Sequence, residues 1–142
     1  MFSKSKIFII YTFVLFIQNC GLIDLWQNRY HEVRESYYNT GMLEYSSSYL
    51  DDKLDGPSYH YNIEGVLVSY AEYSKGSTHG LWEIFYDSGE LKYSCTYFYG
   101  HKHGEEKFYH DNGQIQSLIK YDYGKEISDI MRWDENGELL YR

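Results

Sequence analysis

The sequence predicts an all-β protein, an elongated twisted antiparallel sheet made of about five tandem 24-residue β-hairpin repeats. Tyr supplies 18 of the 142 residues and Pro only one, a composition typical of strands joined by tight turns. Eleven of the twelve glycines fall on three series with a period of 24 residues, and such periodicity is the signature of a repeat architecture. The first series is Gly41, Gly65, Gly89, Gly113 and Gly137, the second is Gly56, Gly80 and Gly104, and the third is Gly76, Gly100 and Gly124.

The first 20 residues are predicted to be a bacterial signal peptide and not part of the fold. Two lysines precede an apolar run at 7–17, which is shorter than the roughly 20 residues of a bilayer span. The run leads to Cys20 in a context that resembles a lipobox, so we expect Cys20 to be lipidated. An ordinary cleaved signal and an uncleaved anchor are the alternatives. Residues 21–34 would then form a tether or N-terminal cap before the repeats at 35–142.

Each repeat is expected to begin with a strand that leads into a three-residue hairpin loop. Asp or Asn precedes most first-series glycines, and Gly at the end of such a loop takes a positive φ. In the following strand, alternate residues share one face; Leu91 and Tyr93 are two of them. A glycine-bounded loop, such as 100–104, should end the repeat. Aromatic residues recur four positions before the first-series glycines, at Tyr37, Tyr61, Phe85, Tyr109 and Trp133, and eight positions after them, at Tyr49, Tyr73, Tyr97 and Tyr121.

The segments 80–91 and 105–115 resemble the MORN-repeat variant of bacterial proteins. The first reads Gly-Leu-Trp-Glu-Ile-Phe-Tyr-Asp-Ser-Gly-Glu-Leu, and the second repeats its aromatic pair and its closing glycine. The resemblance implies a twisted sheet of successive hairpins over about 35–142. It also implies a relationship to proteins labelled YwqK-type antitoxins, and MORN repeats elsewhere are associated with protein contacts and sometimes with phospholipid binding.

The charge argues against two classes of partner. The formal net charge is −8, and it becomes −10 without the first 20 residues, because 11 basic and 21 acidic residues then remain. A surface of this sign repels phosphate backbones and anionic headgroups. We therefore expect no nucleic-acid partner and no electrostatic binding to membranes. Membrane contact is expected only through a lipid at Cys20.

No group of residues in the sequence forms a catalytic pattern, so the protein is predicted not to be an enzyme and to use no metal or cofactor. His101 and His103 could form a metal-binding pair, but His79 occupies the same repeat position as His103, which favours a structural role. Cys95 stands at a position that holds small or apolar residues in other repeats. A thiol nucleophile needs a nearby base, and none is evident.

A single-layer sheet cannot cover both faces, so some aromatic residues must be exposed, and exposed apolar patches mark binding sites. The candidate binding residues are Tyr38, Tyr86, Tyr99 and Tyr123. The leading hypothesis is a non-catalytic protein of the cell envelope that binds an unknown protein partner. A toxin-neutralising antitoxin or immunity protein, which rests on the resemblance, and a cell-wall glycan binder are the alternatives. Open sheet ends also make self-association possible.

Overall fold

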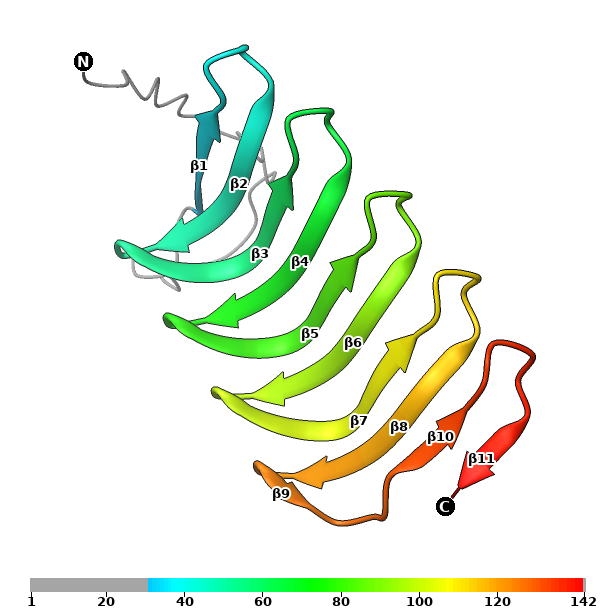
Figure 1. Cartoon of the computed structure of the whole chain (residues 1–142). Coiled ribbons are helices and arrows are strands. Elements are labelled where there is room, and N and C mark those ends of the chain that lie inside the picture. The colour runs from blue at the N-terminus through cyan, green and yellow to red at the C-terminus, as the bar shows by residue number, and fades with distance from the viewer. Residues whose placement is uncertain (1–30, 142) are drawn as a thin grey trace, which may run out of the picture.

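The computed structural model describes residues 31–141, which form one open antiparallel sheet of eleven strands (Figure 1). Within this part of the chain, no helix is long and apolar enough to cross a membrane. The strands are β1 (Glu32–Tyr37), β2 (Leu43–Leu50), β3 (Lys53–Tyr61), β4 (Leu67–Ser74), β5 (Ser77–Phe85), β6 (Leu91–Phe98), β7 (His101–Tyr109), β8 (Ile115–Asp122), β9 (Lys125–Glu126), β10 (Met131–Trp133) and β11 (Leu139–Tyr141).

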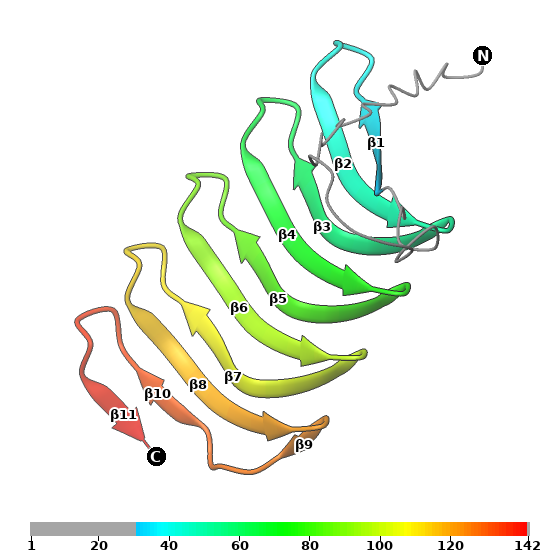
Figure 2. The ribbon, with the colours of Figure 1, turned by 180° about the vertical axis from the view of Figure 1, so that it is seen from behind.

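The strands follow one another across the sheet in sequence order, except that the short β9 pairs only with β8. Both views show bent strands stacked as successive hairpins (Figures 1 and 2). This arrangement confirms the predicted fold of tandem hairpins. The first strand begins at Glu32, earlier than the predicted start of the repeats at residue 35, because Glu32 to Tyr37 pair with β2.

The first-series glycines close the predicted three-residue loops. At Gly89, φ is +89°, and the Gly89 N–H donates to the Tyr86 carbonyl at 2.8 Å. The Tyr86 N–H donates in turn to Glu90. The same pair of bonds recurs at all five loops. Asn62 caps its loop because its side-chain oxygen accepts the Val66 N–H at 2.9 Å.

The prediction of a loop at 100–104 is wrong. Tyr99 and Gly100 form a two-residue turn, with φ of +46° and +84°, as in the hairpin turns whose twist matches that of the strands. The next strand, β7, starts at His101 and runs through Gly104. Gly104 has φ of +90° and lies where the β6–β7 register shifts. It is therefore a bulge glycine and not a loop boundary.

One face of the sheet, which we call the packed face, holds nearly all the buried side chains. Strand pairing aligns Trp82, Cys95, Glu106 and Ile119 across neighbouring strands. Of the buried residues in the described chain, only Leu118 points to the other face. In β6, Leu91, Tyr93, Cys95 and Tyr97 are each more buried than the residue that follows, which confirms the predicted alternation in this strand. The buried residues are Ser47, Ala71, Tyr93, Cys95, Glu106, Ser117, Leu118 and Ile119.

Candidate binding surface

A polar cluster at the centre of the packed face is structural in character. Glu106 is 5% exposed, accepts the Tyr93 hydroxyl at 2.9 Å and pairs with Lys102. The Lys102 ammonium also lies 4.9 Å from the centre of the Tyr121 ring. Buried charges require compensating partners, and in this cluster the charged groups of Glu106 and Lys102 compensate each other. It joins β6, β7 and β8 and leaves no free group for an incoming ligand.

The pKa shifts in this cluster follow from burial and from the carboxylate of Glu106. Burial, with a further contribution from the Glu106 carboxylate, raises the pKa of Tyr121 to about 12. Burial also raises the pKa of Tyr93. For Lys102, burial lowers the pKa, but the Glu106 carboxylate outweighs this effect and the net pKa is raised.

Cys95 lies in the same cluster and is 1% exposed. Burial raises the pKa of its thiol. Since only the thiolate is a good nucleophile, a buried thiol of this kind is chemically inert. Cys95 is therefore a packing residue of β6.

Two of the four predicted binding residues, Tyr38 and Tyr86, connect neighbouring loops. Each is half-buried. The Tyr38 hydroxyl donates to the Tyr61 carbonyl at 2.8 Å, and the Tyr86 hydroxyl donates to the Tyr109 carbonyl at 2.7 Å. Their side chains hold one three-residue loop against the next, so the four tyrosines do not form a single patch.

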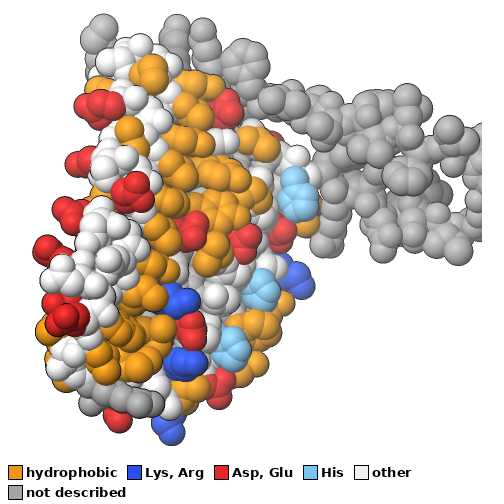
Figure 3. Space-filling model, turned by 90° about the vertical axis from the view of Figure 1, so that its right-hand side faces the viewer, with side chains coloured by type: hydrophobic (Ala, Val, Ile, Leu, Met, Phe, Trp, Pro, Cys, Tyr) orange, Lys and Arg blue, Asp and Glu red, His pale blue; other side chains and the backbone are white. Residues whose placement is uncertain are grey.

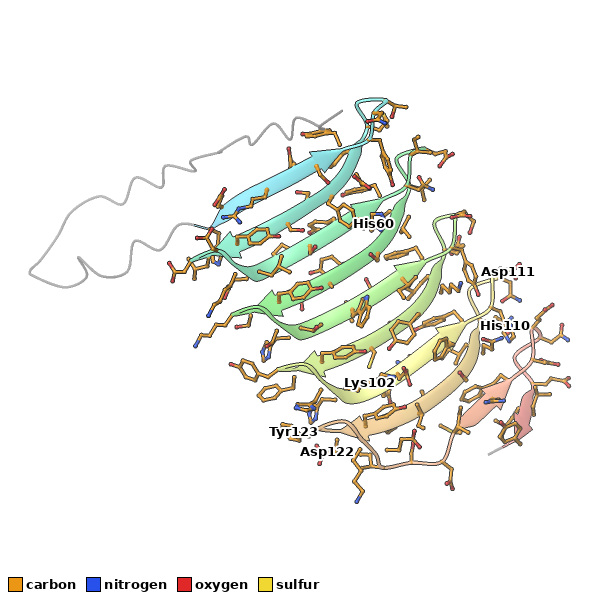
Figure 4. The ribbon with its side chains drawn as sticks, turned by 60° about the vertical axis from the view of Figure 1, so that its left-hand side comes forward. His60, Lys102, His110, Asp111, Asp122 and Tyr123 are labelled. Carbon is orange, nitrogen blue, oxygen red and sulfur yellow. The ribbon has the colours of Figure 1, made fainter. Side chains whose placement is uncertain are left out.

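The other two predicted residues, Tyr99 and Tyr123, lie at the opposite margin of the sheet, at the two-residue turns. Figure 4 shows Tyr123 at this margin and His110 at the other. Phe98 contacts both tyrosines, with ring centres 4.9 Å from Tyr99 and 5.5 Å from Tyr123. Phe98 is not among the predicted residues, because the equivalent positions of the other repeats are not aromatic. We call the five neighbouring rings of His79, Phe98, Tyr99, His103 and Tyr123 the ring surface.

The ring surface is exposed and has a strained backbone. Tyr99 and Tyr123 are 50% and 58% exposed, and Phe98 is 37% exposed. Both tyrosines occupy the left-handed region, with φ of +46° and +45°, which bulky residues rarely adopt. The equivalent turn positions in the preceding repeats hold Asp51 and Lys75. Exposed aromatic residues at conformationally costly positions are typical of functional sites.

The histidines of the ring surface pack chiefly against other rings. The buried Nδ1 atoms of His79 and His103 have no hydrogen-bond partner among the described residues. His103 Nδ1 lies 3.3 Å from Asp122 Oδ1, a separation that pairs charges when the ring is protonated but is not aligned for a hydrogen bond. Within residues 31–141, no three His, Cys, Asp or Glu side chains gather as a metal site would require.

The opposite margin of the sheet is acidic. Its five loops (38–42, 62–66, 86–90, 110–114 and 134–138) contain no Lys or Arg. Acidic side chains crowd one side of the surface and histidines follow the other (Figure 3). The two margins therefore differ in chemistry, and the exposed rings of the ring surface lie at the margin opposite the acidic loops. The acidic residues of the five loops are Glu64, Asp87, Glu90, Asp111, Asp134, Glu135 and Glu138.

Comparison with known proteins supports the repeat assignment. The sequence profile described as MORN repeat variant matches residues 78–98 and 102–123. No curated protein matches the sequence at a significant level. Among solved structures, the chain is similar to "Crystal Structure of TarM", with 16% identity and a TM-score of 0.40, over 60% of this chain and 17% of that chain. The chain thus spans less than a fifth of that protein. In the present chain, the two segments that match the MORN repeat variant contain four of the five rings of the ring surface.

Proposed function

We propose that this protein is a non-catalytic repeat scaffold that binds a protein partner through the ring surface. The observation that carries the proposal is the contiguous exposure of Phe98, Tyr99 and Tyr123. Tyrosine supplies a large contact area at a low entropy cost and carries a hydroxyl for hydrogen bonding. MORN repeats generally mediate interactions with proteins or membranes.

The place of action that we propose is the cell envelope, with Cys20 lipidated. The support is the sequence of residues 1–20, which lie outside the described part of the chain. An acyl-modified cysteine with more than one chain anchors a protein stably. Metabolic labelling with a fatty acid tests this: wild type should take up label and Cys20→Ala should not. Equal labelling of the two would refute the anchor.

Site-specific photo-crosslinking tests the binding proposal. A photoreactive phenylalanine analogue replaces Tyr123 in the full chain, and crosslinked products are recovered from the native envelope and identified by mass spectrometry. The matched control carries the analogue at Ile63, which is 49% exposed but lies in a loop of the acidic margin. We expect one protein to be crosslinked in stoichiometric amount from position Tyr123 and none from position Ile63.

The identity of the crosslinked protein assigns the biological role. A toxic protein that this chain silences on co-expression would assign the toxin-neutralising role. A structural envelope protein would assign a scaffold. If the Tyr123 and Ile63 positions yield the same products, the ring surface is not the binding site and the proposal fails.

A further inference from the structure

The ring surface consists of two copies of one unit, placed side by side by the repeat. In the first unit, the rings of His79 and Tyr99 lie 4.5 Å apart. In the second, His103 and Tyr123 lie 5.0 Å apart. Equivalent residues of the two units are separated by one hairpin, which is two strands, and so by about 9.5 Å along the sheet. The surface therefore presents the same chemistry twice at a fixed interval.

Phe98 fills the interval between the two units. Its ring is nearly perpendicular to both tyrosine rings, at 84° to Tyr99 and 83° to Tyr123. Phe98 is also less exposed than either tyrosine. A ligand that fits must meet two exposed tyrosines from hairpins spaced about 9.5 Å apart, with an apolar ring between them.

The repeat length of the polyproline II helix matches the spacing of the two hairpins. It contains three residues per turn with a rise of about 3.1 Å, so its side chains recur on one side every 9.3 Å or so. We propose that the ring surface binds a proline-rich segment of the partner in this conformation, lying across the turns. Residues three apart in the segment would then contact Tyr99 and Tyr123. This inference rests on the proposed function and specifies the chemistry of its partner.

The polar groups of the surface suit such a segment. A polyproline II helix has no internal hydrogen bonds, so its carbonyls are free to accept. The hydroxyls of Tyr99 and Tyr123 have no partner among the described side chains and can donate to these carbonyls. Aromatic grooves that bind proline-rich ligands work in this way. Asp122, which is 56% exposed in its side chain, and the net charge of −8 favour basic residues beside the prolines.

The ring geometry favours this ligand over a glycan. The rings within the two units are tilted at 47° and 56° to each other, and Phe98 stands perpendicular to both tyrosines. These rings do not form the flat platform on which the faces of successive sugars would stack.

Titration of the full-length protein with a synthetic peptide tests the inference. The peptide has proline at every third position and a terminal arginine, and the control peptide has the same composition with the prolines displaced from this spacing. Binding is followed by NMR at the amides of Gly100 and Gly124, which lie in the two turns. The spaced peptide should shift both signals until they saturate. The control peptide should bind at least about tenfold more weakly.

The protein variant that removes the surface is Tyr99→Asn with Tyr123→Asn, since Asn tolerates a positive φ. Lys75→Asn changes the same turn position one repeat earlier, where φ is +53°, and is the matched control. The double variant should lose at least about tenfold in affinity, whereas Lys75→Asn should bind like wild type. The absence of peptide binding to wild type, or equal binding by the double variant, overturns the inference.

A linear glycan fragment is titrated in parallel. If the glycan shifts the Gly100 and Gly124 amides and the peptide does not, the ligand class proposed here is wrong. If neither ligand binds but crosslinking at Tyr123 captures a protein, the partner presents another kind of surface. The proposed function then stands and this inference fails.

Discussion

At the scale of single residues, Gly80 shows how a bulge constrains the sequence. Its φ is +108°, and a Cβ built there would overlap the carboxylate of Glu72. That carboxylate accepts the Leu81 N–H at 2.8 Å and the Tyr70 hydroxyl at 2.7 Å. The glycine thus lets one side chain satisfy an amide that the bulge leaves unpaired. Gly104, at the equivalent position, has φ of +90° with the nearest atom at 3.9 Å.

We therefore expect Gly80→Ala to destabilise the protein more than Gly104→Ala. Both variants incur the backbone strain of a positive φ, about 1 kcal/mol. Only Gly80→Ala also displaces Glu72, which adds on the order of 1 kcal/mol or more for the disturbed hydrogen bonds. Denaturant unfolding measures the difference. Equal destabilisation would show that Glu72 adjusts to the new methyl group without loss.

The raised pKa of Tyr121 predicts a loss of stability at alkaline pH. Its pKa rises from about 10 in the unfolded chain to about 12 in the fold, because of burial and the nearby Glu106 carboxylate. A raised pKa contributes stability below pH 10 that is lost as pH rises towards 12. Tyr121→Phe should lessen the slope of that loss in unfolding experiments. Tyr123→Phe, which removes one hydroxyl from an exposed turn, is the control and should leave the slope unchanged.

At the scale of elements, each hairpin is held to the next by bonds between turns as well as by the strand ladder. At the acidic margin, the Tyr86 hydroxyl donates to the carbonyl of Tyr109, the last residue of the strand that leads into the following loop. His110 does the same through Nε2, 3.0 Å from the Trp133 carbonyl. At the ring-surface margin, the Gly100 N–H donates to the Thr78 carbonyl at 2.8 Å. Both margins are thereby tied from repeat to repeat.

Tyr86→Phe should cost about 0.5–1.5 kcal/mol of unfolding free energy, since it removes one hydrogen bond and leaves the ring in place. Tyr59→Phe is the matched control, because the Tyr59 ring packs against Tyr70 at 5.2 Å and its hydroxyl has no partner among the described residues. Thermal unfolding of both variants measures the difference. If both variants unfold at the same temperature, the bond between loops contributes nothing measurable.

The elements that the sequence predicted best are those with a strong local signal. Glycine with a preceding Asp or Asn marks the three-residue loops, and alternation places Tyr93 and Cys95 on the packed face. The two-residue turn at Tyr99 was missed because tyrosine is not a turn-forming residue. Phe98 was missed because only the stacking of repeats brings it between Tyr99 and Tyr123. Contacts between repeats join residues far apart in the sequence, so the sequence of one repeat does not indicate them.

At the scale of the whole molecule, stability is unevenly distributed along the array. Most of the buried residues lie in β6 to β8, and Cys95 on β6 is the most buried side chain described. By contrast, the three residues of β11 are all exposed. Because each hairpin contacts only its neighbours, stability in such arrays is a sum of local terms. The end formed by β10 and β11 therefore depends on a single neighbouring strand, β8.

The rates of amide hydrogen exchange should reflect this uneven distribution of stability. We expect the slowest amide exchange in β6 to β8 and the fastest in β11, because opening of the end requires the loss of few contacts. Mass-spectrometric exchange on the full chain measures it. Uniform protection from β2 to β11 would instead indicate that the sheet opens as one cooperative unit.

At the two-residue turns, the exposed side chains can vary without a change in the strands that build the sheet. Asp51, Lys75, Tyr99 and Tyr123 occupy one geometric position in successive hairpins, and the two residue pairs next to each turn have the same register whichever residue stands there. New combinations at these few positions would change the surface chemistry of the margin while the sheet remains intact. Duplication of a hairpin would add one more variable position to the row. The array is thus suited to diversification, in evolution or in design, by point changes at its turns.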